Sequence, residues 1–197
     1  EQAKPVVLHG EQGLSRKSST PGNASYYYSM TNLKANGAIT TPRGTFSVTG
    51  AAWKDHEWST SSLGEDVVGW DWFSLQLADG REIMYAFLRK KDNNFEEVSG
   101  GTLVYPDGAV RPLSLADVEI TALETWTSPH SGAIYPAGWR FTIPAEGIDL
   151  YIKSLRPHQE LRVSTIYWEG AVEIEGTQSG YGYVELTGYA GSMQGRM

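Results

Sequence analysis

Residues 69–90 read G-W-D-W-F-S-L-Q-L-A-D-G-R-E-I-M-Y-A-F-L-R-K. Successive side chains of an extended strand point to opposite faces of a sheet. The alternate apolar residues of 73–77 therefore share one face, which we expect to point into a core together with Asp71. Trp70 and Trp72 fall on the opposite face. The stretch thus predicts a strand with one buried side.

Turn residues extend this pattern along the chain. Asp79-Gly80 and Asp107-Gly108 are β-hairpin signals between runs that are rich in β-branched and aromatic residues. No amphipathic helical stretch of three turns is present, so we expect an all-β fold, as an antiparallel barrel or a sandwich. The predicted strands are residues 25–33, 44–53, 70–78, 81–90, 101–105, 118–123, 137–143, 148–155, 160–168, 171–175 and 181–189.

Composition limits the classes of partner. The 197 residues are 40% hydrophobic, enough for one large β domain, which we expect over 25–197 after a leader segment at 1–24. The net charge of -7, from 16 basic and 23 acidic residues, argues against nucleic acid and anionic membranes as partners. No cysteine is present, which excludes thiolate chemistry. No apolar run reaches the ~20 residues that span a bilayer, and no feature assigns a compartment.

The two tryptophans of the outer face predict a covered surface. Two exposed indoles would form an apolar patch that soluble monomers usually avoid. We therefore expect Trp70 and Trp72 to contact another barrel, either an upstream domain of the same polypeptide or a second copy. The binding cavity is expected beside this contact, because domain junctions are common ligand sites.

A second stretch, A-W-K-D-H-E at 52–57, carries the candidate chemistry. In a strand, Trp53, Asp55 and Glu57 share one face, whereas His56 lies on the other. This alternation makes a contiguous Asp-His-Glu metal site improbable, and no other histidine spacing fits a metal motif. Carboxylates beside an indole fit proton transfer, or serve only as buried hydrogen-bond partners.

Aromatic residues supply the second half of a possible mechanism. They make up 12% of the chain. Ring faces stabilise positive charge, so a neighbouring acid could protonate an alkene and a positioned water could complete a hydration. Barrels also need bulky inward residues, which is the alternative role of each ring. Nucleophilic hydrolysis has little support, because no G-x-S-x-G elbow is present.

The motifs that combine these features resemble the lipocalin-like AttH family, whose superfamily includes the carotenoid hydratases. They are N-A-S-Y-Y-Y-S at 23–29, W-K-D-H-E at 53–57, G-W-D-W-F-S-L-Q-L at 69–77, T-S-P-H-S-G-x-x-Y-P at 127–136, Y-W-E-G at 167–170 and G-Y-G-Y-V-E-L-T-G-Y at 180–189. The resemblance implies a lipocalin-like antiparallel β-barrel. It also implies a two-barrel protein, of which this chain corresponds to the second barrel, with the first upstream.

The resemblance further implies a cofactor-independent addition of water to an isoprenoid double bond. It places the acid at Asp55, aided by His56 or Glu57, and puts tyrosines at Tyr26 and Tyr28, where the hydratases have a His and a Trp. That departure removes a candidate base. The expected substrate-binding residues are Tyr26, Tyr28, Trp53, Trp70, Asp71, Trp72, Trp168, Glu169, Tyr183 and Glu185.

Three alternative functions are compatible with these residues and with the family resemblance. The first is a hydratase or cyclase that acts on an apolar isoprenoid- or polyketide-like molecule, with Asp55 as the proton donor. The second is a non-catalytic barrel that binds a lipophilic ligand. The third is a structural role, in which the acids only join two half-molecules. The sequence predicts no metal and no cofactor for any of them.

Overall fold

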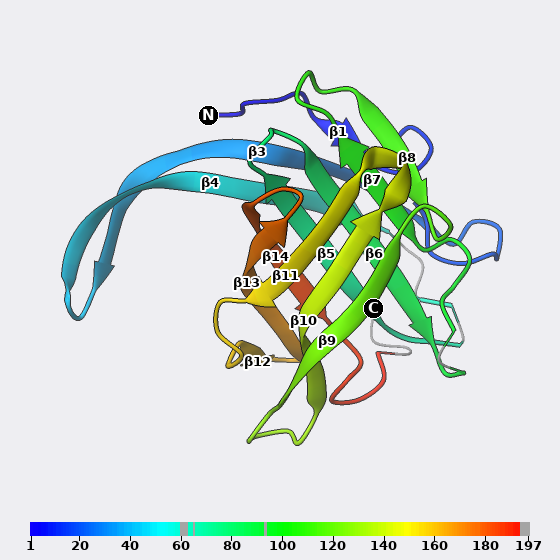
Figure 1. Cartoon of the computed structure of the whole chain (residues 1–197). Coiled ribbons are helices and arrows are strands. Elements are labelled where there is room, and N and C mark those ends of the chain that lie inside the picture. The colour runs from blue at the N-terminus through cyan, green and yellow to red at the C-terminus, as the bar shows by residue number, and fades with distance from the viewer. Residues whose placement is uncertain (60–62, 65, 93, 194–197) are drawn as a thin grey trace.

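The computed structural model of the chain is built from antiparallel strands (Figure 1). It describes all residues except 60–62, 65, 93 and 194–197. The expected all-β, lipocalin-like class is confirmed: ten strands form one curled sheet, and four form a smaller sheet. Within the described residues, a short 3-10 helix, Pro144–Glu146, is the single helical element, and no helix is long and apolar enough to cross a membrane.

The large sheet follows a meander with two breaks in strand order, where β14 lies beside β5 and β11 lies beside β13. Its spatial order is β8 (Val110–Ser114), β7 (Gly100–Val104), β6 (Glu82–Lys90), β5 (Val67–Leu77), β14 (Gly180–Leu186), β13 (Ile166–Gly176), β11 (Ile148–Ser154), β10 (Ile134–Ile143) and β9 (Glu119–Thr127), with β12 (Glu160–Arg162) beside β13. The small sheet consists of β1 (Val7–Leu8), β2 (Leu14–Arg16), β3 (Ala24–Thr41) and β4 (Gly44–Trp58).

Side chains fill the interior of the curled sheet. Phe73 of β5 packs edge-on against Trp139, with ring centroids 5.7 Å apart, and Trp139 contacts Trp168. All three side chains are almost completely buried. The predicted inward face of β5 is therefore confirmed, and the space that could hold a ligand in a wider barrel is here a packed core.

The small sheet covers the outer face of β5, β6 and β7. Trp72 of β5 reaches Tyr27 of β3, Glu82 of β6 reaches Thr31, and Thr102 of β7 reaches His9. The layer between the sheets is thus rich in polar contacts. Two short pieces of the expected leader, β1 and β2, pair with β3 and belong to this layer.

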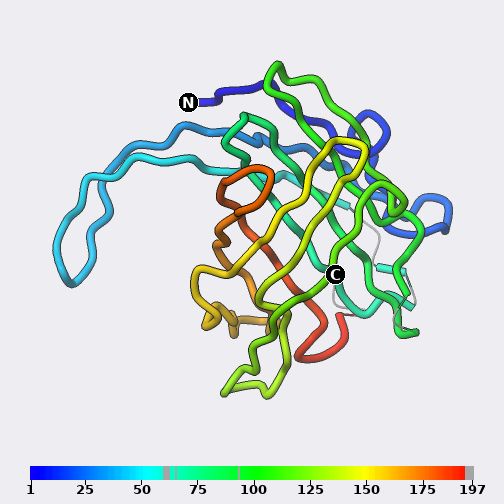
Figure 2. The backbone as a smooth tube through the Cα atoms, in the orientation of Figure 1, coloured from blue at the N-terminus to red at the C-terminus, as the bar shows by residue number. Residues whose placement is uncertain are grey.

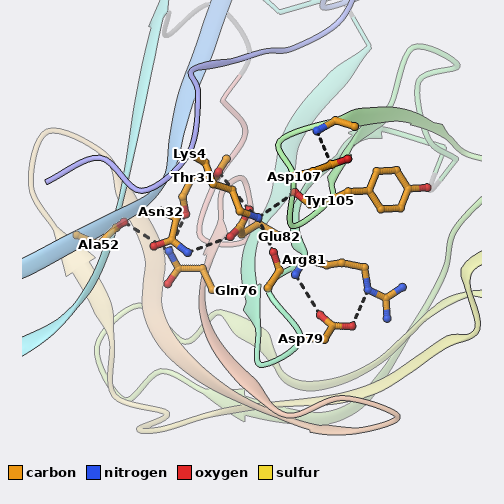
Figure 3. Close-up of polar contacts among 12 residues, drawn as sticks. Lys4, Thr31, Asn32, Ala52, Gln76, Asp79, Arg81, Glu82, Tyr105 and Asp107 are labelled. Carbon is orange, nitrogen blue, oxygen red and sulfur yellow. Dashed lines mark hydrogen bonds and ion pairs between the residues drawn. The ribbon is translucent and has the colours of Figure 1, made fainter.

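A buried ion pair fastens the N-terminal segment to the large sheet (Figure 3). Lys4 Nζ lies 2.6 Å from a carboxylate oxygen of Glu82, whose side chain is 1% exposed. Asn32 Nδ2 donates to the other oxygen at 3.0 Å, and the Thr31 hydroxyl donates from 3.4 Å. Lys4 also donates to the Tyr105 carbonyl at 3.0 Å. One charged cluster therefore joins the N-terminal segment, β3 and β6.

The far half of the β3–β4 hairpin extends away from the rest of the molecule (Figure 2). Residues 35–51 are exposed on both faces of this two-stranded arm, and Ile39, Phe46 and Val48 are apolar residues among them. Both strands are longer than the sequence predicts: β3 continues through Asn36-Gly37 to Thr41, and β4 continues past Trp53 to Trp58. The sequence prediction also misses β8, and it joins β12 to the start of β13.

Candidate functional site

The β3–β4 pairing places Asp55 between the two sheets. Asp55 lies opposite Ser29, and Glu57 lies opposite Tyr27. A β-bulge shifts this register between Met30 and Leu33, so that two residues of β3 stand against Trp53 alone. The bulge therefore decides which side chains of β3 share the face of Asp55.

Three donors converge on the half-buried Asp55 carboxylate. Trp53 Nε1 donates to Oδ1 at 2.6 Å, and the Tyr27 hydroxyl donates to Oδ2 at 2.6 Å. The Ser29 hydroxyl also donates to Oδ1. Burial raises the pKa of Asp55, whereas the hydrogen bonds from these three donors act in the opposite direction.

Trp72 links this carboxylate to the large sheet. Its Nε1 donates to the Tyr27 hydroxyl at 3.1 Å, and its ring meets the Trp53 ring edge-on at 6.5 Å. The predicted outward orientation of Trp70 and Trp72 is thus confirmed. The cover over Trp72 comes from this chain's own hairpin, and Trp70 packs against a small cluster that includes Val67 and Leu88.

A buried histidine lies behind Asp55. His9 Nε2 is 2.7 Å from the Ser29 hydroxyl, and Nδ1 is 3.0 Å from the Thr102 hydroxyl. Burial, followed by the charge of Lys17, lowers the pKa of His9 to about 3, so the imidazole is neutral near pH 7. A neutral His9 fixes the orientation of the Ser29 hydroxyl, which in turn donates to Asp55.

Glu57 forms the exposed end of the same face. Its carboxylate pairs with Lys17 and accepts a hydrogen bond from the Ser25 hydroxyl. Lys17 also stands over the Tyr27 ring, 5.4 Å from its centroid. Glu57 is therefore an ion-paired neighbour of Asp55.

Glu185 of β14 continues the acidic surface beyond the hairpin. It lies opposite Trp72 of β5 on one side and Glu169 of β13 on the other. Trp70 Nε1 donates to its Oε1 at 2.6 Å. Burial raises the pKa of Glu185 to about 7, with further contributions from the negative charges of Glu169, Asp55 and Glu57.

The opposite face of the hairpin holds a separate aromatic cluster. The His56 ring lies 5.2 Å from the Tyr28 ring and 5.0 Å from the Trp58 ring, and Tyr26 stacks on Trp58 at 5.5 Å. The strand alternation predicts this position for His56. The structure therefore separates His56, Tyr26 and Tyr28 from Asp55, so in this arrangement His56 does not touch the carboxylate.

Two further expected site residues lie inside the large sheet. Asp71 is buried with the core, as its strand face predicts, where Arg89 Nε donates to it at 2.8 Å and the Tyr189 hydroxyl donates at 2.9 Å. Burial raises the pKa of Asp71, and Arg89 opposes this effect. Trp168 is fully buried, and its Nε1 donates to the Pro157 carbonyl. Both face the core, away from Glu185.

The structure thus brings together eight of the expected residues on the face between and beside the sheets. They are Trp53, Asp55, Glu57, Trp70, Trp72, Glu169, Tyr183 and Glu185. Across the described part of the chain, no group of three or more acidic or histidine side chains is arranged to hold a metal ion.

Nearly the whole chain matches one known family. The AttH-like family matches residues 1–189. The chain belongs to the AttH-like family. This confirms the resemblance that the sequence motifs indicate, and no curated protein matches the chain.

Two solved structures are similar to this AttH-like chain. A candidate AttH from Nitrosomonas europaea shares 36% identity with a TM-score of 0.87, over 94% of this chain and 58% of that one. Kievitone hydratase from Nectria haematococca shares 20% identity with a TM-score of 0.76, over 95% of this chain and 59% of that one. The AttH-like chain therefore spans less than two thirds of either relative.

Three residues of the candidate site are not predicted from the sequence: Tyr27, Ser29 and His9. Tyr27 and Ser29 sit in the same Y-Y-Y-S run as the tyrosines that were predicted. The T-P-R-G turn at 41–44 indicates that this run pairs with residues 52–57. It does not fix the register of that pairing. His9 carries no such signal, because its contact with Thr102 joins residues far apart in sequence.

Two surface grooves lie away from this site. One, of about 400 Å³, is lined by Val68, Arg89 and Phe95 among others, and the second, of about 500 Å³, lies over β9, β10 and β11. Neither is lined by Asp55, Trp70 or Trp72. A cavity beside the two tryptophans in the AttH-like protein remains a prediction.

Proposed function

We propose that this protein is a cofactor-independent, acid-catalysed hydratase or cyclase that acts on an apolar isoprenoid- or polyketide-like small molecule. The observation that carries the proposal is the half-buried Asp55 carboxyl group, held by Trp53, Tyr27 and Ser29 beside the indoles of β5. A carboxyl group beside aromatic rings suits proton transfer in the hydration of an alkene, and the ring faces stabilise the cation that forms. The similarity to kievitone hydratase supports the same reaction class.

We also propose that the site is completed by a second lipocalin-like barrel, from an upstream domain or another subunit. The similar AttH structure is much longer than this chain, and the arm at 35–51 is exposed on both faces. Glu57 and Tyr183 lie at the open end of the site, where a second barrel could close it.

The test incubates the purified protein with kievitone, with lycopene and with a linear polyketide, and follows the products by mass spectrometry. A hydratase adds the mass of one water molecule, and a cyclase gives an isomer that chromatography separates. Asp55→Asn keeps the shape of the side chain: its amide oxygen can take the place of Oδ1 and accept from Trp53 and Ser29, and the Tyr27 hydroxyl can turn to accept from its NH2 group. We therefore expect a folded variant with no turnover.

The matched control is Asp107→Asn, a carboxylate in an exposed hairpin where Asn-Gly suits the turn as well as Asp-Gly does. It should retain full turnover. Full turnover by a folded Asp55→Asn variant would eliminate a catalytic role for this residue.

A non-catalytic binding barrel is the second candidate. The observation in its favour is that the Asp55 carboxylate already accepts three hydrogen bonds, as a structural anchor does. Stoichiometric quenching of tryptophan fluorescence by these compounds, with no chemical change, is the result that supports binding alone.

A further inference from the structure

The two carboxyl groups of the site differ in how many donors they accept from. Both oxygens of Asp55 are occupied: Oδ1 by Trp53 and Ser29, and Oδ2 by Tyr27. Donors of this kind stabilise the ionised form, and among the described residues Oδ2 accepts from Tyr27 alone, which leaves it a position for an incoming proton. The hydrogen bonds around Asp55 therefore suit a carboxylate that receives a proton.

Glu185 has the contrasting environment. Its Oε1 accepts from Trp70 Nε1 at 2.6 Å, and among the described residues no hydrogen bond is donated to Oε2. Its direct neighbour across the strand pair is Glu169, and like charges that face each other across strands repel. One oxygen of Glu185 is thus free to carry a proton.

The charged and titratable groups around Glu185 are mostly acidic. Glu169 and Tyr167 approach from β13, Asp55 and Glu57 from β4, and Tyr183 from its own strand. On the hairpin side, the cation Lys17 is already paired with Glu57. Burial and these negative charges together raise the pKa of Glu185 to about 7.

From this geometry we infer that Glu185 is the proton donor of the proposed reaction and that Asp55 is the base that receives the proton of the attacking water. The inference rests on the proposed function and deepens it, and it moves the role of proton donor, which the sequence places at Asp55, to Glu185. It assigns the two halves of a hydration to two residues that approach the site from different sheets.

The Glu185 carboxyl group gives its proton to one carbon of the double bond, whose electron pair forms the new C–H bond and leaves a cation on the other carbon. The oxygen of water bonds to that cation, and one water proton passes to Asp55. The net change is alkene plus water to alcohol. A proton then returns from Asp55 to Glu185 through solvent, which restores both groups.

Two measurements test the assignment. The first is an infrared titration of the substrate-free protein, in which a protonated carboxyl band should titrate near pH 7. We expect Glu185→Gln to remove this band and Asp55→Asn to retain it. A band that persists unchanged in Glu185→Gln would overturn the assignment.

The second measurement is the pH dependence of kcat/KM with the compound that the wild type hydrates, starting with kievitone. Activity should fall as the pH rises above about 7, because the donor loses its proton. Glu185→Gln should reduce kcat/KM by about 100-fold or more. Glu169→Gln removes a negative charge that raises the pKa of Glu185. This variant should remain active, and its kcat/KM should begin to fall at a lower pH than that of the wild type.

The matched control is Glu173→Gln, an exposed residue four positions further along β13 on the same face, which should leave the descending limb of the pH profile in place. An active Glu185→Gln variant with an unchanged pH profile, beside an inactive Asp55→Asn variant, would refute Glu185 as donor and leave the proposed function standing. Full activity in both variants, or no turnover of any compound by the wild type, would instead refute the proposed function.

Discussion

Replacing Lys4 by methionine should destabilise the protein strongly, because Lys4 balances a carboxylate that water does not reach. Glu82 is 1% exposed, and Lys4 Nζ lies 2.6 Å from one of its oxygens. Methionine keeps much of the volume of the lysine side chain and removes the charge. In the variant, Glu82 keeps the neutral donors Asn32 and Thr31 and loses its counter-charge.

Removing one partner of a buried ion pair costs about 3–5 kcal/mol. Domains are stable by roughly 5–15 kcal/mol, so the variant loses a large part of the total. With a urea m-value of about 2 kcal/mol/M, the midpoint of unfolding should fall by roughly 1.5–2.5 M. A second change, Glu82→Gln in the Lys4→Met background, removes the unpaired charge and still accepts from Asn32, so it should recover most of the loss.

The assay is urea unfolding followed by tryptophan fluorescence. The control is Lys34→Met, an exposed lysine on β3, which should change the stability by less than about 0.5 kcal/mol. If Lys4→Met unfolds at the same urea concentration as the wild type, the stability of the fold does not depend on the positive charge beside Glu82. If the double variant is less stable than Lys4→Met, the loss does not come from an unpaired carboxylate.

Two further predictions concern stability. In Gly101→Ala, the new Cβ would lie 2.0 Å from the Met84 carbonyl oxygen, so we expect a loss of about 1–3 kcal/mol or more in urea unfolding. Gly37→Ala, where nothing lies within 4 Å, should be nearly neutral, and equal effects at the two sites would contradict this. Folding lowers the pKa of His9 from 6.5 to about 3. Between pH 3 and pH 6.5, His9 is therefore protonated in the unfolded chain and neutral in the folded one. Stability should therefore fall as the pH drops from about 6.5 toward 3, and His9→Gln should show a weaker pH dependence of its urea midpoint; identical slopes would rule out this contribution.

The fold follows from local sequence where a turn and an alternating strand agree. The run at 69–77 alternates apolar and other residues, and Asp79-Gly80 closes its hairpin, so both the strand and its buried face are predictable. β8 is different. Its sequence, V-R-P-L-S, is short and contains a proline, which a sheet accepts at an edge strand such as this one.

The candidate site is only partly predictable, because a bulge decides it. Counting back from the turn at 41–44 without a bulge would pair Asp55 with Met30 and Glu57 with Tyr28, which would bring Tyr28 and Tyr26 to the acidic face. The extra residue between Met30 and Leu33 replaces them with Tyr27 and Ser29. Thr31 and Asn32, adjacent in the bulge, both donate to Glu82. A one-residue shift of register is not visible in the residue types of either strand.

The projecting arm has a consequence for local stability. Beyond Lys34, each of its two strands has one hydrogen-bonded neighbour among the described residues, and a two-stranded ribbon alone is marginally stable in water. Amide hydrogens should therefore exchange with solvent fastest at the turn and progressively more slowly toward Asp55. A partner that binds the arm must first compensate the entropy lost when the ribbon becomes rigid. The affinity of that partner could thus be adjusted by substitutions at the tip of the arm, which leave every residue around Asp55 untouched.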